Sequence, residues 1–160
     1  CLGLFKSQIL FMYNKILCYY IMVTFRNIGK HDYDAVYSLL QQLTEVGEYK
    51  EQHFLRFLAT LPSNIHIICI CDKENIVGMG TLMVEQKIIH NFNKVGHIED
   101  VVINSKYKGQ GYGKQLIHYL TYLAKQNKCY KVILDCSRKV SGFYEKCGYT
   151  EKNISMGIYF

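Results

Sequence analysis

The chain has 160 residues, of which 49% are hydrophobic and 14% aromatic, and it carries a formal net charge of +6. This length and apolar content suffice for one globular domain, and a single proline without low-complexity runs excludes a disordered or collagen-like protein. Both signs of charge are interspersed, so the basic excess favours local attraction for anionic ligands over a nucleic acid-binding stripe.

The first 22 residues are apolar and aromatic, but polar residues interrupt them. No uninterrupted run approaches the roughly 18 residues that a membrane-spanning helix needs, and no small-residue cleavage site is visible, so neither a span nor a signal peptide is predicted. We expect an N-terminal apolar extension over 1–22 and a folded domain over 23–160. Membrane or organelle attachment through the extension stays open as an alternative.

The first half of the domain predicts a strand, two helices and a hairpin. Alternation over 23–28 indicates a strand, and the turn that follows it ends at Asp32, a helix N-cap. Apolar residues at helical spacing predict helices over 36–43 and 51–60. The β-rich segments 65–71 and 76–87 predict a hairpin, with the polar residues 72–75 as the link between its strands.

The second half predicts a strand over 96–104, a glycine-rich turn over 108–113 and a helix with apolar spacing from Leu116 to Ala124. An apolar run over 130–136 predicts a buried strand. A short helix over 139–146 follows, with Gly148 in the left-handed position behind it, and a weak last strand covers 149–160. This order predicts a mixed α/β domain without an internal repeat.

The seven cysteines are an odd number without a Cys-x-x-Cys pair, which fits neither a disulfide framework nor a zinc ribbon. The sequence therefore predicts reduced thiols, a cytoplasmic location and no metal site. Cys69 and Cys71 lie two apart in an apolar run, so we interpret them as small buried hydrophobic residues on one face of a strand.

Three glycines, at 109, 111 and 113, stand directly before the predicted helix. Such a turn lets backbone N–H groups approach an anion, so a phosphate-bearing ligand is a natural occupant. The P-loop pattern fails, because Lys108 stands at its first glycine and Gln115 at its Ser/Thr, and the dinucleotide fingerprint fails because the third glycine comes one residue early. By itself the turn fits a structural corner as well as a phosphate cradle.

In its setting between an apolar strand and an amphipathic helix, Lys108-x-x-Gly111-x-Gly113 resembles the pyrophosphate-binding turn of the GNAT superfamily, Gln/Arg-x-x-Gly-x-Gly/Ala, with lysine in first place. Segments 96–103, 129–136 and 143–149 resemble the eukaryotic glucosamine 6-phosphate N-acetyltransferases. The resemblance covers about 22–160. It implies a GNAT fold, a mostly antiparallel central sheet flanked by helices, and direct acetyl transfer from acetyl-CoA to the amine of glucosamine 6-phosphate, for UDP-N-acetylglucosamine synthesis.

The resemblance implies that the amide arm of acetyl-CoA pairs with the strand at 101–103, while the turn holds the pyrophosphate. The residues so assigned are Val101, Val102, Ile103, Lys108, Gly109, Gln110, Gly111, Tyr112, Gly113 and Lys114. An N–H of the same strand would face the thioester oxygen, where negative charge develops. Tyr144 matches the tyrosine that contacts and protonates the departing CoA thiolate. Without the resemblance, Tyr144 would be interpreted as a core aromatic residue beside Phe143.

Acidic residues interrupt or end the two apolar strands of this half. Glu99 and Asp100 are adjacent, so at least one must reach solvent or a polar pocket, for instance at a β-bulge with one exposed acid. Asp135 follows an apolar run, which implies a partner or the edge of a cleft. By resemblance the three acids contact the amino sugar and take up the proton of its ammonium group. The identity of the general base stays open.

The resemblance assigns the remaining sugar phosphate contacts to Thr44, Lys87, His90, Val101, Tyr130 and Lys131. Two positions depart from the family pattern. Val140 stands where relatives carry an asparagine that contacts CoA, and Tyr159 stands where they carry a phosphate-binding arginine. These departures bear on ligand affinity more than on reaction type.

A homodimer with a sugar site shared between its subunits is also implied by the resemblance, without a nucleic acid or membrane partner. Two other functions stay open: acetylation of a protein or of another small amine, and a non-catalytic CoA-binding module. The Glu99–Asp100 pair and segment 129–131 weigh against the first, whereas Val140 and Tyr159 leave room for the second.

Overall fold

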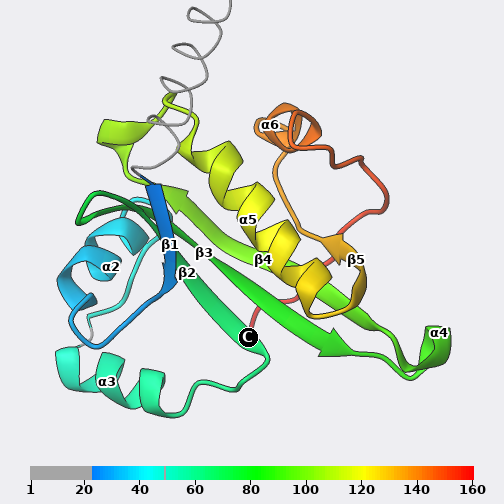
Figure 1. Ribbon diagram of the computed structural model, residues 1–160, viewed down its shortest axis with the longest axis horizontal. Coiled ribbons are helices and arrows are strands. Elements are labelled where there is room, and N and C mark those ends of the chain that lie inside the picture. Colours follow the sequence, from blue (N-terminus) through cyan, green and yellow to red (C-terminus); the bar gives the residue numbers. More distant parts are fainter. Residues whose placement is uncertain (1–22, 49) are drawn as a thin grey trace, which may run out of the picture.

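A five-stranded sheet forms the centre of the computed structural model, which describes residues 23–48 and 50–160 (Figure 1). The predicted extension over 1–22 lies outside the described residues. The first four strands pair as antiparallel neighbours in chain order, and the fifth is parallel to the fourth, so the predicted mostly antiparallel sheet is confirmed. The strands are β1 (Val23–Asn27), β2 (Ile65–Asp72), β3 (Asn75–Gln86), β4 (Lys94–Ile103) and β5 (Cys129–Ile133).

Helices cover both faces of this sheet. The two helices α2 (Tyr33–Leu40) and α3 (Glu51–Ala59) lie on one face, and the long helix α5 (Tyr112–Gln126) crosses the other (Figure 1). Short helical turns complete the domain: α4 (Ile89–Phe92), η1 (Ser105–Tyr107) and α6 (Ser141–Glu145). No helix within 23–48 or 50–160 is long and apolar enough to cross a membrane.

The side chains of β2 alternate between two hydrophobic cores. Ile68 and Ile70 pack in the core under α5, whereas Cys69 and Cys71 pack in the core under α2 and α3. All four are buried, as expected for a central strand covered on both faces. Full burial of one such aliphatic side chain contributes about 1.5–3 kcal/mol, so the two cores hold the sheet between its helices. Both cysteines are free, as the sequence predicts.

Asp32 takes the predicted N-cap position of α2 but makes no side-chain bond to the helix. Its Oδ2 accepts from the Gly29 N–H at 2.6 Å, and its two oxygens accept from the Arg26 guanidinium at 2.6 and 2.9 Å. The hydrogen bonds from Arg26 hold the pKa of this carboxyl below its usual range. Asp32 therefore fixes the turn between β1 and α2 by a bidentate ion pair.

The last strand predicted over 149–160 is wrong, because residues 149–160 have no regular secondary structure. Apolar side chains alternate there, but a strand needs a hydrogen-bonding neighbour, and Ile154, Met156 and Ile158 are 91%, 93% and 78% exposed. The strand predicted over 130–136 also ends early, at Ile133. The left-handed Gly148 is confirmed with φ 93°, and behind it the Tyr149 N–H donates to the Tyr144 carbonyl at 3.1 Å.

Candidate active site

The edge of β4 that faces β5 is only partly paired. β5 is in register with β4 from Lys94 to His97, while β4 continues to Ile103. In the described part of the chain, the residues of β4 after His97 have no pairing with β5. Unpaired N–H and C=O groups on a strand edge accept an extended polar chain as an added strand. The expected contact segment 101–103 lies on this free stretch.

A β-bulge on the opposite edge of β4 turns the strand. Its pairing with β3 moves from Thr81–Glu99 to Met79–Val102, which leaves Asp100 and Val101 opposite a single glycine, Gly80. Asp100 has φ 50°, and both Glu99 and Asp100 are exposed. The expected bulge is present, and it exposes both acids instead of one.

The glycine-rich turn leads directly into α5. Gly109 and Gly111 have φ of 79° and 88°, and a Cβ at either would meet no atom within 4 Å. Gly111 is the N-cap, so the first N–H groups of a 15-residue helix lack a side-chain cap. Open space, left-handed glycines and uncapped N–H groups fit a pyrophosphate, and Lys108 and Lys114 beside them are exposed.

Gly113 serves a different purpose from the other two glycines. A Cβ there would lie 3.2 Å from the ring of Phe143 and 3.5 Å from Ile103. Because glycine has no side chain, α6 can pack against the start of α5. Phe143 contacts the ring of the next residue, Tyr144, with centroids 5.0 Å apart. The glycine-rich turn and Tyr144 are therefore linked through one aromatic side chain.

Tyr144 and Asp135 line one cavity of about 380 Å³. The end of β5, Tyr144 of α6 and the C-terminal segment line this cavity. Ser155 belongs to the C-terminal segment, and its hydroxyl donates to Asp135 Oδ2 at 3.1 Å. Asp135 is exposed, so it stands at the edge of a cleft and has a partner, as the sequence predicts. Cys136 lines the same cavity.

Burial and neighbouring charges raise the pKa values of Glu99 and Tyr144. Although Glu99 is exposed, the surrounding protein removes part of its hydration, which raises the pKa of its carboxyl, and the charges of Asp100 and Asp135 raise it further. Partial burial raises the pKa of the Tyr144 phenol, and Cys136 and Glu99 contribute to the same shift. The site thus pairs a phenol that holds its proton with a carboxylate that is more basic than usual.

Three of the expected sugar phosphate residues also come together. The rings of His90 and Tyr130 are 4.8 Å apart, and Lys131 Nζ lies 5.6 Å from the Tyr130 centroid. Lys87 instead pairs with Glu85, which also binds His97 Nε2 at 2.8 Å. Lys131 is the middle residue of β5 and precedes Asp135 by four residues, about 13 Å along an extended chain, so this group stands back from Asp135 along the strand.

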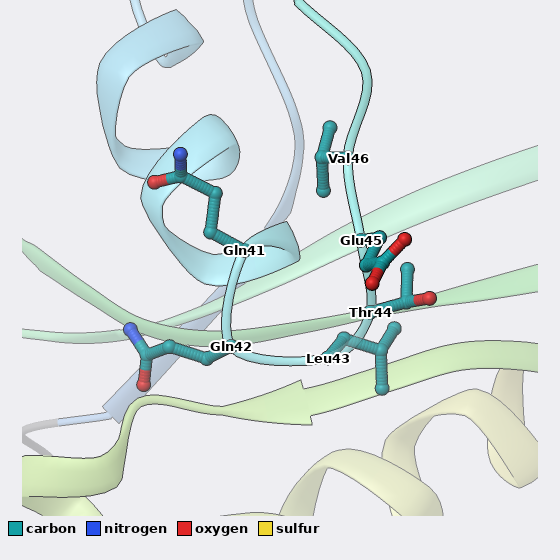
Figure 2. Close-up of a pocket in the computed structure, with 6 residues that line it drawn as sticks. All are labelled: Gln41, Gln42, Leu43, Thr44, Glu45 and Val46. Atoms are coloured by element: carbon teal, nitrogen blue, oxygen red, sulfur yellow. The ribbon is translucent and has the colours of Figure 1, made fainter.

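Thr44 lies apart from both groups, on the exposed loop after α2. Figure 2 shows Thr44 on this loop, in a surface hollow lined by residues 41–46. The Ser105 N–H donates to Gln42 Oε1 at 2.8 Å, which ties this loop to the end of β4. The structure does not bring Thr44 to the cavity of Tyr144, because the residues lining that cavity come from 132–155.

The two departures from the family pattern occupy exposed positions. Val140 is 46% exposed directly before α6, where its side chain offers no polar group to a ligand. Tyr159 is 98% exposed near the chain end.

Sequence reasoning missed Cys136 and Ser155, which line the cavity of Tyr144. Cys136 ends an apolar run and Ser155 lies in the segment after α6, so no local signal distinguishes them.

Comparisons with known proteins identify the family of the chain. The family model described as Acetyltransferase (GNAT) family matches residues 33–149. Glucosamine 6-phosphate N-acetyltransferase of Candida albicans is 44% identical over 138 residues, which cover 83% of this chain and 93% of that protein. The Arabidopsis thaliana protein of the same name is 42% identical over 128 residues, or 77% and 86% of the two chains.

Solved structures give the same result. A crystal structure of glucosamine-6-phosphate N-acetyltransferase from Arabidopsis thaliana aligns with TM-score 0.82 at 37% identity, covering 86% of this chain and 98% of that one. A Trypanosoma brucei acetyltransferase aligns with TM-score 0.81 at 33% identity, covering 86% and 99%. The residues that the family model matches include the glycine-rich turn and Tyr144.

Proposed function

Because the chain belongs to the GNAT acetyltransferase family, and within it to the glucosamine 6-phosphate N-acetyltransferases, we propose that it transfers the acetyl group of acetyl-CoA directly to the amine of glucosamine 6-phosphate. The observation that carries the proposal is the meeting of Asp135 and Tyr144 at one cavity, with Glu99 close enough to affect the pKa of the phenol. An acid–base pair of this kind is what amide formation from a thioester requires.

The chain's own groups divide the work of binding as follows. The N–H groups of 109–114 hold the pyrophosphate of acetyl-CoA, and the free edge of β4 at 101–103 pairs with its amide arm. An N–H on that edge faces the thioester oxygen, where it stabilises the negative charge that develops during attack. Acetyl-CoA supplies the acetyl group and the thiol leaving group.

Proton transfer falls to the acids and to Tyr144. Glu99, Asp100 and Asp135 attract the ammonium form of the amino sugar, and one of them takes its proton, directly or through water, so that the free amine can attack. Tyr144 gives its phenolic proton to the departing thiolate. Because its pKa is raised, the phenol is protonated at neutral pH and holds the proton that the thiolate takes.

The proposal includes a homodimer in the cytoplasm. His90 and Lys131 are suited to an anionic phosphate but stand away from the acids of their own chain, which supports a sugar site completed by a second copy. Five described cysteines are free, which supports a reducing compartment.

The experiment that tests the reaction is CoA-thiol release from acetyl-CoA with glucosamine 6-phosphate, glucosamine and mixed peptides at equal concentrations. We expect glucosamine 6-phosphate to be strongly preferred. A preference for peptides or another amine would refute the substrate and leave the fold standing. CoA binding without turnover on any acceptor would refute the enzymatic proposal in favour of a CoA-binding module.

A further inference from the structure

A hydrogen bond joins the glycine-rich turn to a distant hairpin. The Tyr112 hydroxyl donates to Asp72 Oδ2 at 2.9 Å, between residues 40 apart in sequence. Tyr112 is the first residue of α5, directly after the left-handed Gly111. Asp72 is the last residue of β2 and pairs with Val23 of β1 and with Asn75 of β3. The hairpin and the start of α5 lie at the same end of the sheet (Figure 1).

The glycine-rich turn has little packing of its own to fix it. Gly109 and Gly111 have open space around the position of a Cβ, and Lys108, Gly109, Gln110 and Gly111 are exposed. Gln110 bonds only back to Lys106 within the same turn, at 3.3 Å, among the hydrogen bonds described for it. A glycine-rich segment samples many backbone conformations unless a neighbouring group restrains it.

The phenol of Tyr112 supplies such a restraint at the C-terminal side of the turn. Its ring packs with the core under α5 and against Tyr107, with centroids 5.9 Å apart. The hydrogen bond to Asp72 then ties the ring to the end of the sheet where β2 pairs with β1 and β3. The half-buried Asp72 is anchored on both sides by strand pairing, so it is a rigid acceptor.

We infer that Asp72 is a positioning residue for acetyl-CoA binding: through the Tyr112 hydroxyl it holds the turn so that its N–H groups converge on the pyrophosphate. This inference rests on the proposed function, since it takes the turn as the pyrophosphate site. It adds a residue outside the site, and it assigns the side chain of Tyr112 a function beyond that of its backbone N–H.

The direction in which removal of Asp72 changes CoA affinity distinguishes a restraint on the turn from an effect of charge. Asp72 is an acid near a site for a polyanion, so its charge alone opposes CoA binding, and its removal would strengthen binding. If Asp72 instead restrains the turn, its removal weakens CoA binding, because part of the binding free energy is then spent on ordering the turn. The variants Asp72→Ala and Asp72→Asn separate the two effects, since an asparagine oxygen still accepts from the phenol without the charge.

The experiment measures CoA affinity by calorimetry on the whole chain, together with KM and kcat in the acetyl-transfer assay. We expect Asp72→Ala and Tyr112→Phe each to weaken CoA binding by about 3- to 10-fold, and the double variant to be no weaker than either. Asp72→Asn should bind CoA as well as the wild type or better. KM for acetyl-CoA should rise with the dissociation constant, while kcat and KM for the acceptor keep their wild-type values in Asp72→Ala.

The matched control is Glu74→Ala, which removes an exposed acid from the same hairpin and should leave CoA affinity unchanged or slightly increased. Wild-type or tighter CoA binding by Asp72→Ala would overturn the inference, as would additive losses in the double variant. If Asp72→Ala does not fold, Tyr112→Phe and Asp72→Asn decide the question. Failure of turnover with intact CoA binding would refute the proposed reaction alone, whereas a wild-type chain that does not bind CoA would refute both.

Discussion

Two neighbouring tyrosines differ in what their hydroxyls contact. The Tyr149 and Thr121 hydroxyls share a hydrogen bond of 2.7 Å, which fixes the segment after α6 onto α5. Tyr144 is packed edge to face against Tyr149, with centroids 6.3 Å apart, and its phenol is the one linked electrostatically to Glu99. Burial raises the pKa of both phenols, so the raised value alone does not identify the acid.

We predict that Tyr144→Phe lowers kcat by about 100-fold, because the departing thiolate loses its proton donor, while KM for acetyl-CoA changes by less than about threefold. The measurement is CoA-thiol release at saturating acceptor. Tyr149→Phe is the matched control: it should lower the melting temperature through the lost bond to Thr121 and keep kcat within about threefold. Equal kcat in Tyr144→Phe and the wild type would remove Tyr144 from this role.

The acid cluster gives a prediction on pH dependence. An ionised Glu99 accepts a proton, so kcat/KM should fall on the acid side as this carboxyl becomes protonated, at a pH above the ordinary value of about 4.3. Asp100→Asn removes one of the charges that raise the pKa of Glu99, so the acid limb should move to lower pH. Asparagine tolerates φ 50°, so the bulge is preserved.

The control for this shift is Asp34→Asn, which removes the same charge from the exposed first turn of α2 and should leave the limb in place. A limb that stays in place in Asp100→Asn would mean that Glu99 is not the group that titrates in the reaction.

At the scale of elements, the contact between β3 and β4 supports the strand that would bind the cofactor. A Cβ on Gly78 would clash with the end of Ile103 and lie 2.7 Å from the Val102 carbonyl oxygen, which is backbone and cannot turn aside. Gly78 is opposite Ile103 in the sheet register. Glycine is therefore required where β3 approaches the free stretch of β4.

We predict that Gly78→Ala lowers the free energy of unfolding by about 1–3 kcal/mol, because the strands must separate to admit a methyl group. KM for acetyl-CoA should rise as well, since Val102 and Ile103 are displaced. Urea unfolding and the transfer assay measure the two effects. Gly47→Ala, where a Cβ would meet nothing within 4 Å, serves as the control. Equal stability of the two variants would contradict the prediction.

Local patterns predicted most of the elements, since helical spacing and apolar runs report burial directly. They failed where a neighbour decides the structure. β5 ends at Ile133 because it parts from β4, although the apolar run continues to Leu134. The segment 149–160 alternates like a strand and has none of the neighbours that a strand requires in the described chain.

At the scale of the whole molecule, the sequence predicted the acids and Tyr144 through a resemblance, and the structure brings them to one region. It could not predict the bond from Tyr112 to Asp72, because two residues 40 apart carry no common pattern. It also grouped Thr44 and Lys131 with the acids, whereas the described chain keeps them apart. Side chains that act together across elements become evident only in the folded chain.

The separation of Lys131 from the cavity of Tyr144 leads to a prediction about a site shared between two copies. If the phosphate binds at Lys131 of one copy while Tyr144 of the other acts at the amine, two defective variants should complement each other. Tyr144→Phe and Lys131→Ala, refolded together in equal amounts, should recover about a quarter of wild-type activity, because half of the dimers are mixed and each mixed dimer holds one intact site. CoA-thiol release with glucosamine 6-phosphate measures the recovery.

The matched control combines Tyr144→Phe with Asp135→Asn, two variants of the same cavity. Every mixed dimer then carries one defect in each site, so no activity should return. Recovery in both mixtures would point to residual activity of the single variants and would contradict the shared site. No recovery in either mixture would mean that Lys131 and Tyr144 serve the same copy, and the phosphate would then have to reach from the cavity at the end of β5 back to Lys131.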